Sequence, residues 1–126
     1  MFHRELLDLH SSFICVDLSD FKNFFNGVDK TSYVFFVGRG KTKNEDLKAL
    51  DEALIDLQRK GVYVSKSKKL WMHIRACKNV NFDLLNLYID VVQERINKKS
   101  SLLCTVTMNE DKNTLIEVFI VASKAI

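Results

Sequence analysis

Two stretches of the chain place hydrophobic residues three and four positions apart, which is typical of a helix with one buried face. In the first, leucine and alanine recur over residues 47–57 with acidic residues between them. We expect Asn44 to cap the start of this helix and Gly61 to end it. In the second, leucine, valine, isoleucine and a tyrosine recur over residues 84–96, and we expect this helix to begin near Asn81.

Four other stretches are predicted to be strands. Residues 31–37 are mostly aromatic and β-branched, which predicts a strand buried, or nearly buried, on both faces. Residues 70–76 alternate between two sets of side chains, as a half-exposed strand does. Residues 102–108 and 114–123 are joined by a polar, turn-prone segment, so we expect them to pair as an antiparallel hairpin. The short stretch 62–64 is either a further strand or a connection.

The first part of the chain is predicted to be helical and contains an acidic corner. A hydrophobic stripe over residues 2–13 predicts a first helix. Asp17 and Asp20 then lie three residues apart where a short second helix begins, and Phe21 and Phe24 lie on its packed face. Capping of the helix start is one interpretation of the two acids, and a contact with a partner is the other.

Length and composition indicate one globular domain. The chain has 126 residues, of which 47% are hydrophobic and 28% are charged, and its net charge is +3. No apolar run is long enough to span a membrane and no signal peptide is recognisable, so we expect a cytoplasmic protein without membrane contact. Lysines cluster over 41–43 and 66–69, but few aromatic or arginine neighbours accompany them. We interpret both clusters as solvated loops and expect no nucleic-acid binding.

The sequence lacks the usual motifs of an enzyme, a metal site or a cofactor site. No glycine-rich phosphate-binding motif is present, and Gly38 and Gly40 are interpreted as a strand exit that needs permissive backbone angles. The three cysteines are widely spaced, which favours buried, reduced thiols. His73 is interpreted as structural. We therefore expect no metal, no cofactor and no independent enzymatic activity.

The predicted elements combine into an α+β fold. We expect a two-layer sandwich in which a four-stranded mixed sheet carries two helices on one face, with the order βαβαββ over residues 31–123. The N-terminal helices and the acidic loop form a lead-in over residues 1–26. The whole chain, residues 1–126, is expected to be a single domain.

With this order of elements, the chain resembles the C-terminal half of FtsZ, the bacterial tubulin homologue, from about Ser12 to Ala122. FtsZ has a loop of the form Asn-x-Asp-Phe-x-Asp-Val, and CVDLSDF at 15–21 keeps both acids. YVFFVGRGKTKNED stands where FtsZ has a strand and a Gly-Glu-Asn-Arg-Ala helix start. TVTMNEDKNTLIEVFIVAS resembles the last two FtsZ strands. Paired glycines of FtsZ are replaced here by Ala76 and Cys77, and the GTP-binding half has no counterpart.

The resemblance implies a function. In FtsZ, the acidic loop of one subunit faces the GTP of the next subunit and positions the attacking water. The resemblance implies this catalytic role for Asp17 and Asp20, acting in trans on a neighbouring subunit. It also implies a partner-binding face that contains the two acids together with Lys22 and Asn23. The domain would bind FtsZ or an FtsZ-like protein and cap or regulate filament assembly in bacterial cell division.

Two other functions are compatible with the sequence. The first is a self-associating structural protein that has no nucleotide role, with Phe35, Phe36 and Trp71 on an open sheet face forming a homodimer surface. The second is a small-molecule enzyme with a site between subunits. The enzyme is the least favoured, because the sequence offers no arginine cluster and no pair of general acid and base.

Overall fold

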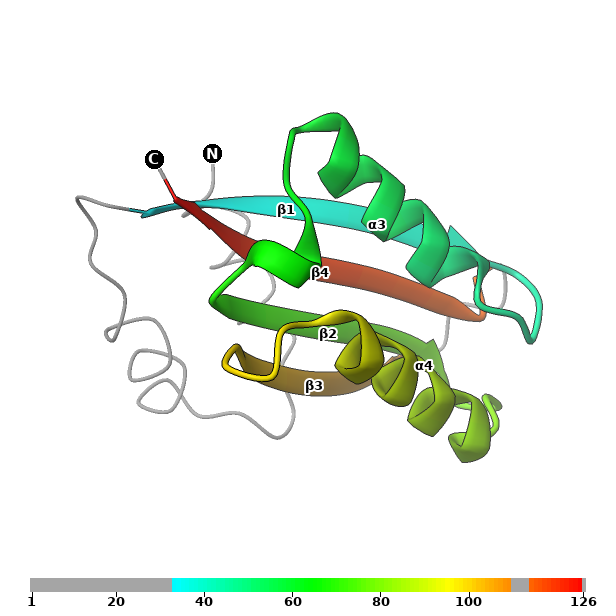
Figure 1. Cartoon of the computed structure of the whole chain (residues 1–126). Helices are drawn as coiled ribbons and strands as arrows, with labels where there is room; N and C mark the ends of the chain where they lie inside the picture. Colours follow the sequence, from blue (N-terminus) through cyan, green and yellow to red (C-terminus); the bar gives the residue numbers. More distant parts are fainter. Residues whose placement is uncertain (1–32, 110–113, 126) are drawn as a thin grey trace.

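The hydrophobic patterns fold into a mixed sheet that carries two helices on one face (Figure 1). The computed structural model describes residues 33–109 and 114–125. The predicted α+β class, with four strands and two helices, is confirmed over these residues. In chain order the elements are β1 (Tyr33–Thr42), α3 (Lys48–Arg59), the 3-10 helix η1 (Val64–Lys66), β2 (Lys69–Cys77), α4 (Phe82–Arg95), β3 (Ser101–Asn109) and β4 (Ile116–Ala125).

The strands lie in the order β1-β4-β2-β3. Strand β4 is antiparallel to both of its neighbours, and β2 and β3 are parallel. The predicted hairpin of the last two strands is therefore wrong, because β2 lies between them. Strand β4 is buried on both faces from Val118 to Ser123, whereas β3 is mostly half-buried. The more hydrophobic strand takes the central place, where both of its edges and both of its faces are covered.

Strand β1 extends beyond the predicted exit and includes both glycines. Neither Gly38 nor Gly40 has a positive φ, so the predicted need for unusual backbone angles is wrong. Both glycines instead allow α3 to approach closely, because a Cβ on Gly40 would lie 1.9 Å from the carbonyl oxygen of Ala49. The strand is also not buried on both faces, since it lies at the sheet edge and Val34 is 41% exposed.

Side chains of α3 satisfy the outer edge of β1. The backbone N–H of Arg39 donates to the carboxylate of Asp56 at 3.1 Å, and that of Lys41 donates to Glu52 at 3.1 Å. These bonds replace the ladder bonds that a further strand would make. The helix thus covers one face of β1 and also occupies part of its free edge.

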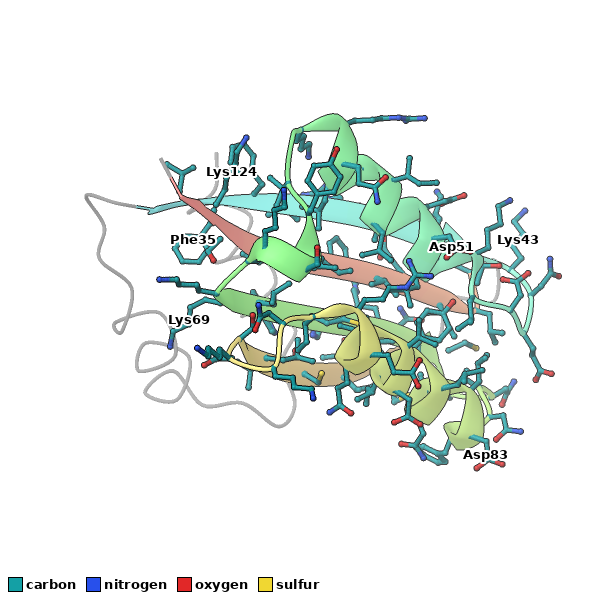
Figure 2. The ribbon with its side chains drawn as sticks, viewed as in Figure 1. Phe35, Lys43, Asp51, Lys69, Asp83 and Lys124 are labelled. Atoms are coloured by element: carbon teal, nitrogen blue, oxygen red, sulfur yellow. The ribbon has the colours of Figure 1, made fainter. Side chains whose placement is uncertain are left out.

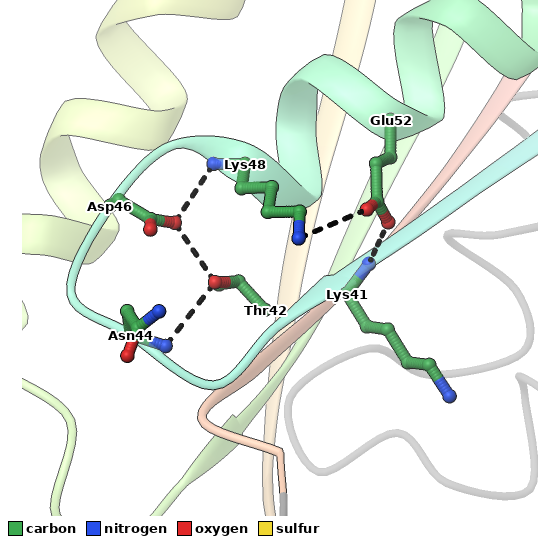
Figure 3. Close-up of polar contacts among 6 residues, drawn as sticks. All are labelled: Lys41, Thr42, Asn44, Asp46, Lys48 and Glu52. Atoms are coloured by element: carbon green, nitrogen blue, oxygen red, sulfur yellow. Dashed lines mark hydrogen bonds and ion pairs between the residues drawn. The ribbon is translucent and has the colours of Figure 1, made fainter.

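The turn between β1 and α3 is closed by polar bonds (Figure 3). Asp46 Oδ1 accepts from the hydroxyl of Thr42 at 2.9 Å and from the backbone N–H of Lys48 at 3.0 Å. Asn44 is therefore not the cap that the sequence predicts, and the helix begins later, at Lys48. Its predicted end is confirmed, because Gly61 has φ +79° directly after the last turn.

Helix α4 begins as predicted. The side chain of Asn81 accepts from the backbone N–H of Asp83, which caps the helix start. The hydroxyl of Tyr88 donates to the carbonyl oxygen of Asp46 at 2.7 Å and so joins α4 to the turn before α3. Burial raises the pKa of Tyr88 to about 12, with a smaller effect of the Asp46 charge.

The main core lies between the sheet and the two helices. Its fully buried members alternate along β2 and β4 with residues of the other face. The largest of them are Leu50, Leu57, Leu70, Met72, Ile74, Tyr88, Ile116 and Ile120.

Candidate functional site at the basic end of the sheet

The predicted partner-binding residues lie outside the part of the chain that the structure describes. These residues are Asp17, Asp20, Phe21, Lys22, Asn23 and Phe24. Their proposed roles therefore rest on the sequence and stay predictions.

The predicted homodimer surface is wrong for Trp71. This side chain is fully buried, and so it cannot lie on an open face. Phe35 and Phe36 are adjacent in β1 and hence point to opposite faces of the sheet, with Phe36 packed against the core beneath the helices. The three aromatic residues do not form one surface.

A buried polar cluster explains why β2 is not half-exposed as predicted. The indole N–H of Trp71 donates to the hydroxyl oxygen of Thr105 at 2.8 Å, and that oxygen lies 2.6 Å from His73 Nδ1. Thr107 Oγ1 lies 3.2 Å from His73 Nε2. Because each ring nitrogen has a threonine hydroxyl beside it, the imidazole is hydrogen-bonded although it is fully buried.

The environment of His73 favours its neutral form. Burial, together with the nearby charge of Arg75, lowers the pKa of His73 to about 4. The ring also lies beside Trp71 and Phe119, with centroid distances of 5.9 and 6.3 Å. A neutral, enclosed imidazole with two hydroxyl partners supports the structural interpretation of this histidine.

The feature that the sequence reasoning missed is the gathering of basic residues at one end of the sheet. Strands β1, β2 and β3 run in the same direction and β4 runs against them, so the starts of β2 and β3 meet the end of β4. The hydroxyl of Ser100 donates to the carbonyl oxygen of Ser67. Ser123 Oγ accepts from the backbone N–H groups of Lys68 and Lys69 at 3.1 and 3.0 Å.

We call this part of the molecule the basic end and define it by residues 59–69, 95–101 and 123–125. These three segments contain lysine and arginine but no aspartate or glutamate. Figure 2 shows Lys69 and Lys124 at this end, with Lys43 and Asp83 at the opposite end. The basic residues are Arg59, Lys60, Lys66, Lys68, Lys69, Arg95, Lys98, Lys99 and Lys124.

Three of these cations, Lys66, Arg95 and Lys124, are exposed. Lys60 lies 3.6 Å from Asp56 and donates to the carbonyl oxygen of Val37. Within residues 33–109 and 114–125, by contrast, no ion pair joins Lys66, Arg95 or Lys124 to a carboxylate. The basic end therefore presents a positive field to a partner.

Tyr63 lies between two hollows at the basic end. Its side chain is 50% exposed, and the ammonium of Lys66 lies 5.8 Å from the ring centroid. One hollow, of about 310 Å³, is lined by Gly61, Val62, Tyr63, Lys66, Ser67, Ser123 and Lys124. The other, of about 270 Å³, is lined by Leu54, Gln58, Val62, Tyr63, Val64, Ser65 and Arg95. The site combines cations, hydroxyls and apolar walls around one aromatic ring.

The sequence held a partial signal for this site. Lys66–Lys69 is visible as a cluster, but Lys98 and Lys124 are far away along the chain and join it only through the strand order. Residues 62–64 also form no strand, and η1 brings Tyr63 to the surface there.

Among the described residues, little supports a catalytic thiol, a metal site or a membrane-spanning helix. Cys77 and Cys104 are free thiols, and burial raises the pKa of Cys104 to about 11, which disfavours the nucleophilic thiolate. In the same part of the chain, no three His, Cys, Asp or Glu residues are arranged to hold a metal ion. None of the helices described there is both long and apolar enough to cross a membrane.

Known proteins resemble this chain in structure and not detectably in sequence. No protein-family model and no curated protein matches the sequence. A structure of an empty FtsZ dimer from M. jannaschii matches with a TM-score of 0.65 and 19% identity over 88% of this chain and 32% of that chain. An FtsZ mutant from the same organism gives the same score and identity over 89% and 33%. CetZ from Methanosaeta thermophila matches with a TM-score of 0.62 and 14% identity over 94% and 34%.

These matches establish the fold. The chain spans about a third of the length of each FtsZ or CetZ chain that it matches. Both organisms are archaea, so the expected bacterial origin stays a prediction. The four-stranded mixed sheet with two helices is the fold of the C-terminal domain of FtsZ, and this chain has that fold.

Proposed function

We propose that this FtsZ-like domain binds a subunit of an FtsZ-type filament and regulates the assembly of that filament in the cytoplasm during cell division. The fold it shares with FtsZ and CetZ over 88–94% of the chain is the observation that carries the proposal. One matching structure is an FtsZ dimer, so FtsZ associates with its own kind. A domain with the same fold is a natural competitor or partner in such an association.

The proposed mode of regulation is capping of a filament end. The described sheet and helices have the fold of the C-terminal domain of FtsZ, so they would offer the filament a surface like that of one part of an FtsZ subunit. We expect it to join one end and to hinder the addition of the next subunit there.

Asp17 and Asp20 are the residues that we propose to act on the partner. A carboxylate close to a γ-phosphate is useful only as a group that orients and polarises water, because the phosphate is already negative. Lys22 and Asn23 are proposed to contact the same partner surface.

A pelleting and GTP-turnover assay with the FtsZ-type protein from the same cell tests this function. We expect stoichiometric domain to lower the mass of polymer or to change the rate of GTP turnover. Unchanged polymer mass and unchanged turnover would contradict the proposal.

The acidic pair is tested separately. Asp17→Ala combined with Asp20→Ala should remove any stimulation of GTP turnover and retain much of the binding. Asp29→Ala, an acid outside the motif, serves as the control. Equal stimulation by the double variant and by the control would show that the two acids have no catalytic role.

A further inference from the structure

The basic end has the properties of a docking surface for a segment of another protein. Its three segments come from different parts of the chain and are held together by the bonds of Ser67, Ser100 and Ser123. The positions of the cations are thus set by the fold and do not belong to one flexible loop. A partner meets a prearranged group of charges, which lowers the conformational entropy lost on binding.

The positive charge of the basic end favours an acidic partner. Lys66 and Lys124 line the same hollow, and Arg95 lines the neighbouring one. None of these cations is neutralised by a carboxylate within residues 33–109 and 114–125. Two acids of α3, Asp56 and Glu52, by contrast accept backbone bonds at the edge of β1.

The shape of the site selects a peptide over a nucleic acid or a lipid surface. Proteins bind single-stranded nucleic acid on rows of exposed aromatic rings. The described basic end exposes one aromatic side chain, that of Tyr63. A flat membrane would contact the rim and would not reach the apolar walls of Leu54, Val62 and Val64. An extended peptide can place alternate side chains in two hollows that flank one ring.

We propose that the basic end binds an acidic peptide segment of a partner protein. Carboxylates of the segment pair with Lys66, Lys124 and Arg95, and an apolar side chain enters the hollow beside Tyr63. This proposal does not rest on the roles proposed for Asp17 and Asp20.

The test is fluorescence anisotropy with the full chain and a short labelled peptide of glutamates with one central leucine. We expect saturable binding that weakens as salt is raised, because the charges are exposed to solvent. Lys66→Glu with Lys124→Glu should weaken binding about tenfold, since two attractions become repulsions. Lys41→Glu with Lys43→Glu changes the net charge equally at the opposite end and should leave binding unchanged.

Further measurements distinguish an acidic peptide from other classes of ligand. A lysine peptide with the same leucine should not bind, and Tyr63→Ala should weaken binding of the acidic peptide. Equal losses in the two double variants would overturn the proposal, as would tighter binding to single-stranded DNA or to phosphatidylserine vesicles. Unchanged thermal unfolding shows that a variant is folded, and Lys66→Gln with Lys124→Gln repeats the test with a milder change.

Discussion

At the scale of single residues, two glycines decide how closely a helix can lie on the sheet. The positions where a Cβ would be on Gly38 and Gly40 are occupied by backbone of α3, namely the carbonyl oxygens of Ala53 and Ala49. Backbone atoms cannot rotate away as a side chain can. Any larger residue must therefore push the helix outward.

Gly40→Ala should consequently destabilise the domain. We expect a loss of about 2 kcal/mol or more in the free energy of unfolding, because the added methyl group forces the helix and strand apart. Denaturant titration measures the loss. Lys41→Ala changes the next, exposed residue and should alter stability by less than about 0.5 kcal/mol. Equal stability of the two variants would show that α3 does not pack as described.

His73 makes stability depend on pH. The folded chain holds its pKa at about 4, below the ordinary 6.5, so the unfolded chain takes up a proton first as pH falls. The stabilisation is complete above pH 6.5 and is lost progressively towards pH 4, by about 3 kcal/mol in all. Unfolding titrations across this range should show a shallower decline for His73→Gln. Parallel declines would mean that the histidine does not titrate abnormally.

At the scale of elements, the edge of β1 is protected by the helix beside it. An unpaired edge strand is a template for pairing with another chain. Here Asp56 and Glu52 accept from the outward N–H groups of Arg39 and Lys41, and Lys60 donates to the outward carbonyl of Val37. An incoming strand would have to displace all three side chains.

Removing the two carboxylates should therefore expose the edge. Glu52→Ala with Asp56→Ala is expected to cost about 1 kcal/mol of stability for each lost bond and to increase self-association. Sedimentation velocity over a range of concentrations measures the association. Glu45→Ala with Asp51→Ala removes the same charge from exposed positions and should behave as the parent chain does. Association in both double variants would attribute the effect to net charge.

The helices and strands also show which parts of the fold could be predicted from sequence patterns. Helix periodicity identified α3 and α4 because one face of each is buried on a single surface. It could not identify the partners of each strand, since β4 pairs with β1 and β2, which are distant in sequence. Alternation in β2 was misleading because Trp71 and His73 carry polar groups that are buried with Thr105 and Thr107. The basic end depends on strand order and was missed for the same reason.

At the scale of the whole molecule, the sheet connects every described element. Strand β2 pairs with β3 on one side and with β4 on the other, and β4 pairs with β1. The two helices share one core with the central strands. Loss of either central strand removes partners from both halves of the sheet, so we expect cooperative unfolding.

Trp71 is a probe of that cooperativity. It is the chain's single tryptophan, is fully buried on β2 and is hydrogen-bonded to Thr105. Its fluorescence should shift to longer wavelength on unfolding, with the same denaturant midpoint as far-ultraviolet circular dichroism. Thr105→Val should lower both midpoints together, because the indole N–H loses an acceptor in the core. Separate midpoints would indicate that the sheet and helices unfold independently.

The central place of β4 also constrains how the domain is made. Residues 116–125 lie between strands that precede them in the sequence, so β1 has no hydrogen-bonded neighbour among the other described strands until they arrive. A nascent chain on the ribosome can form α3 and α4 early, but it must hold β1 and β2 apart until this last strand has left the exit tunnel. Synthesis that stops shortly before residue 116 would yield a sheet without its middle, which is a substrate for chaperones and proteases.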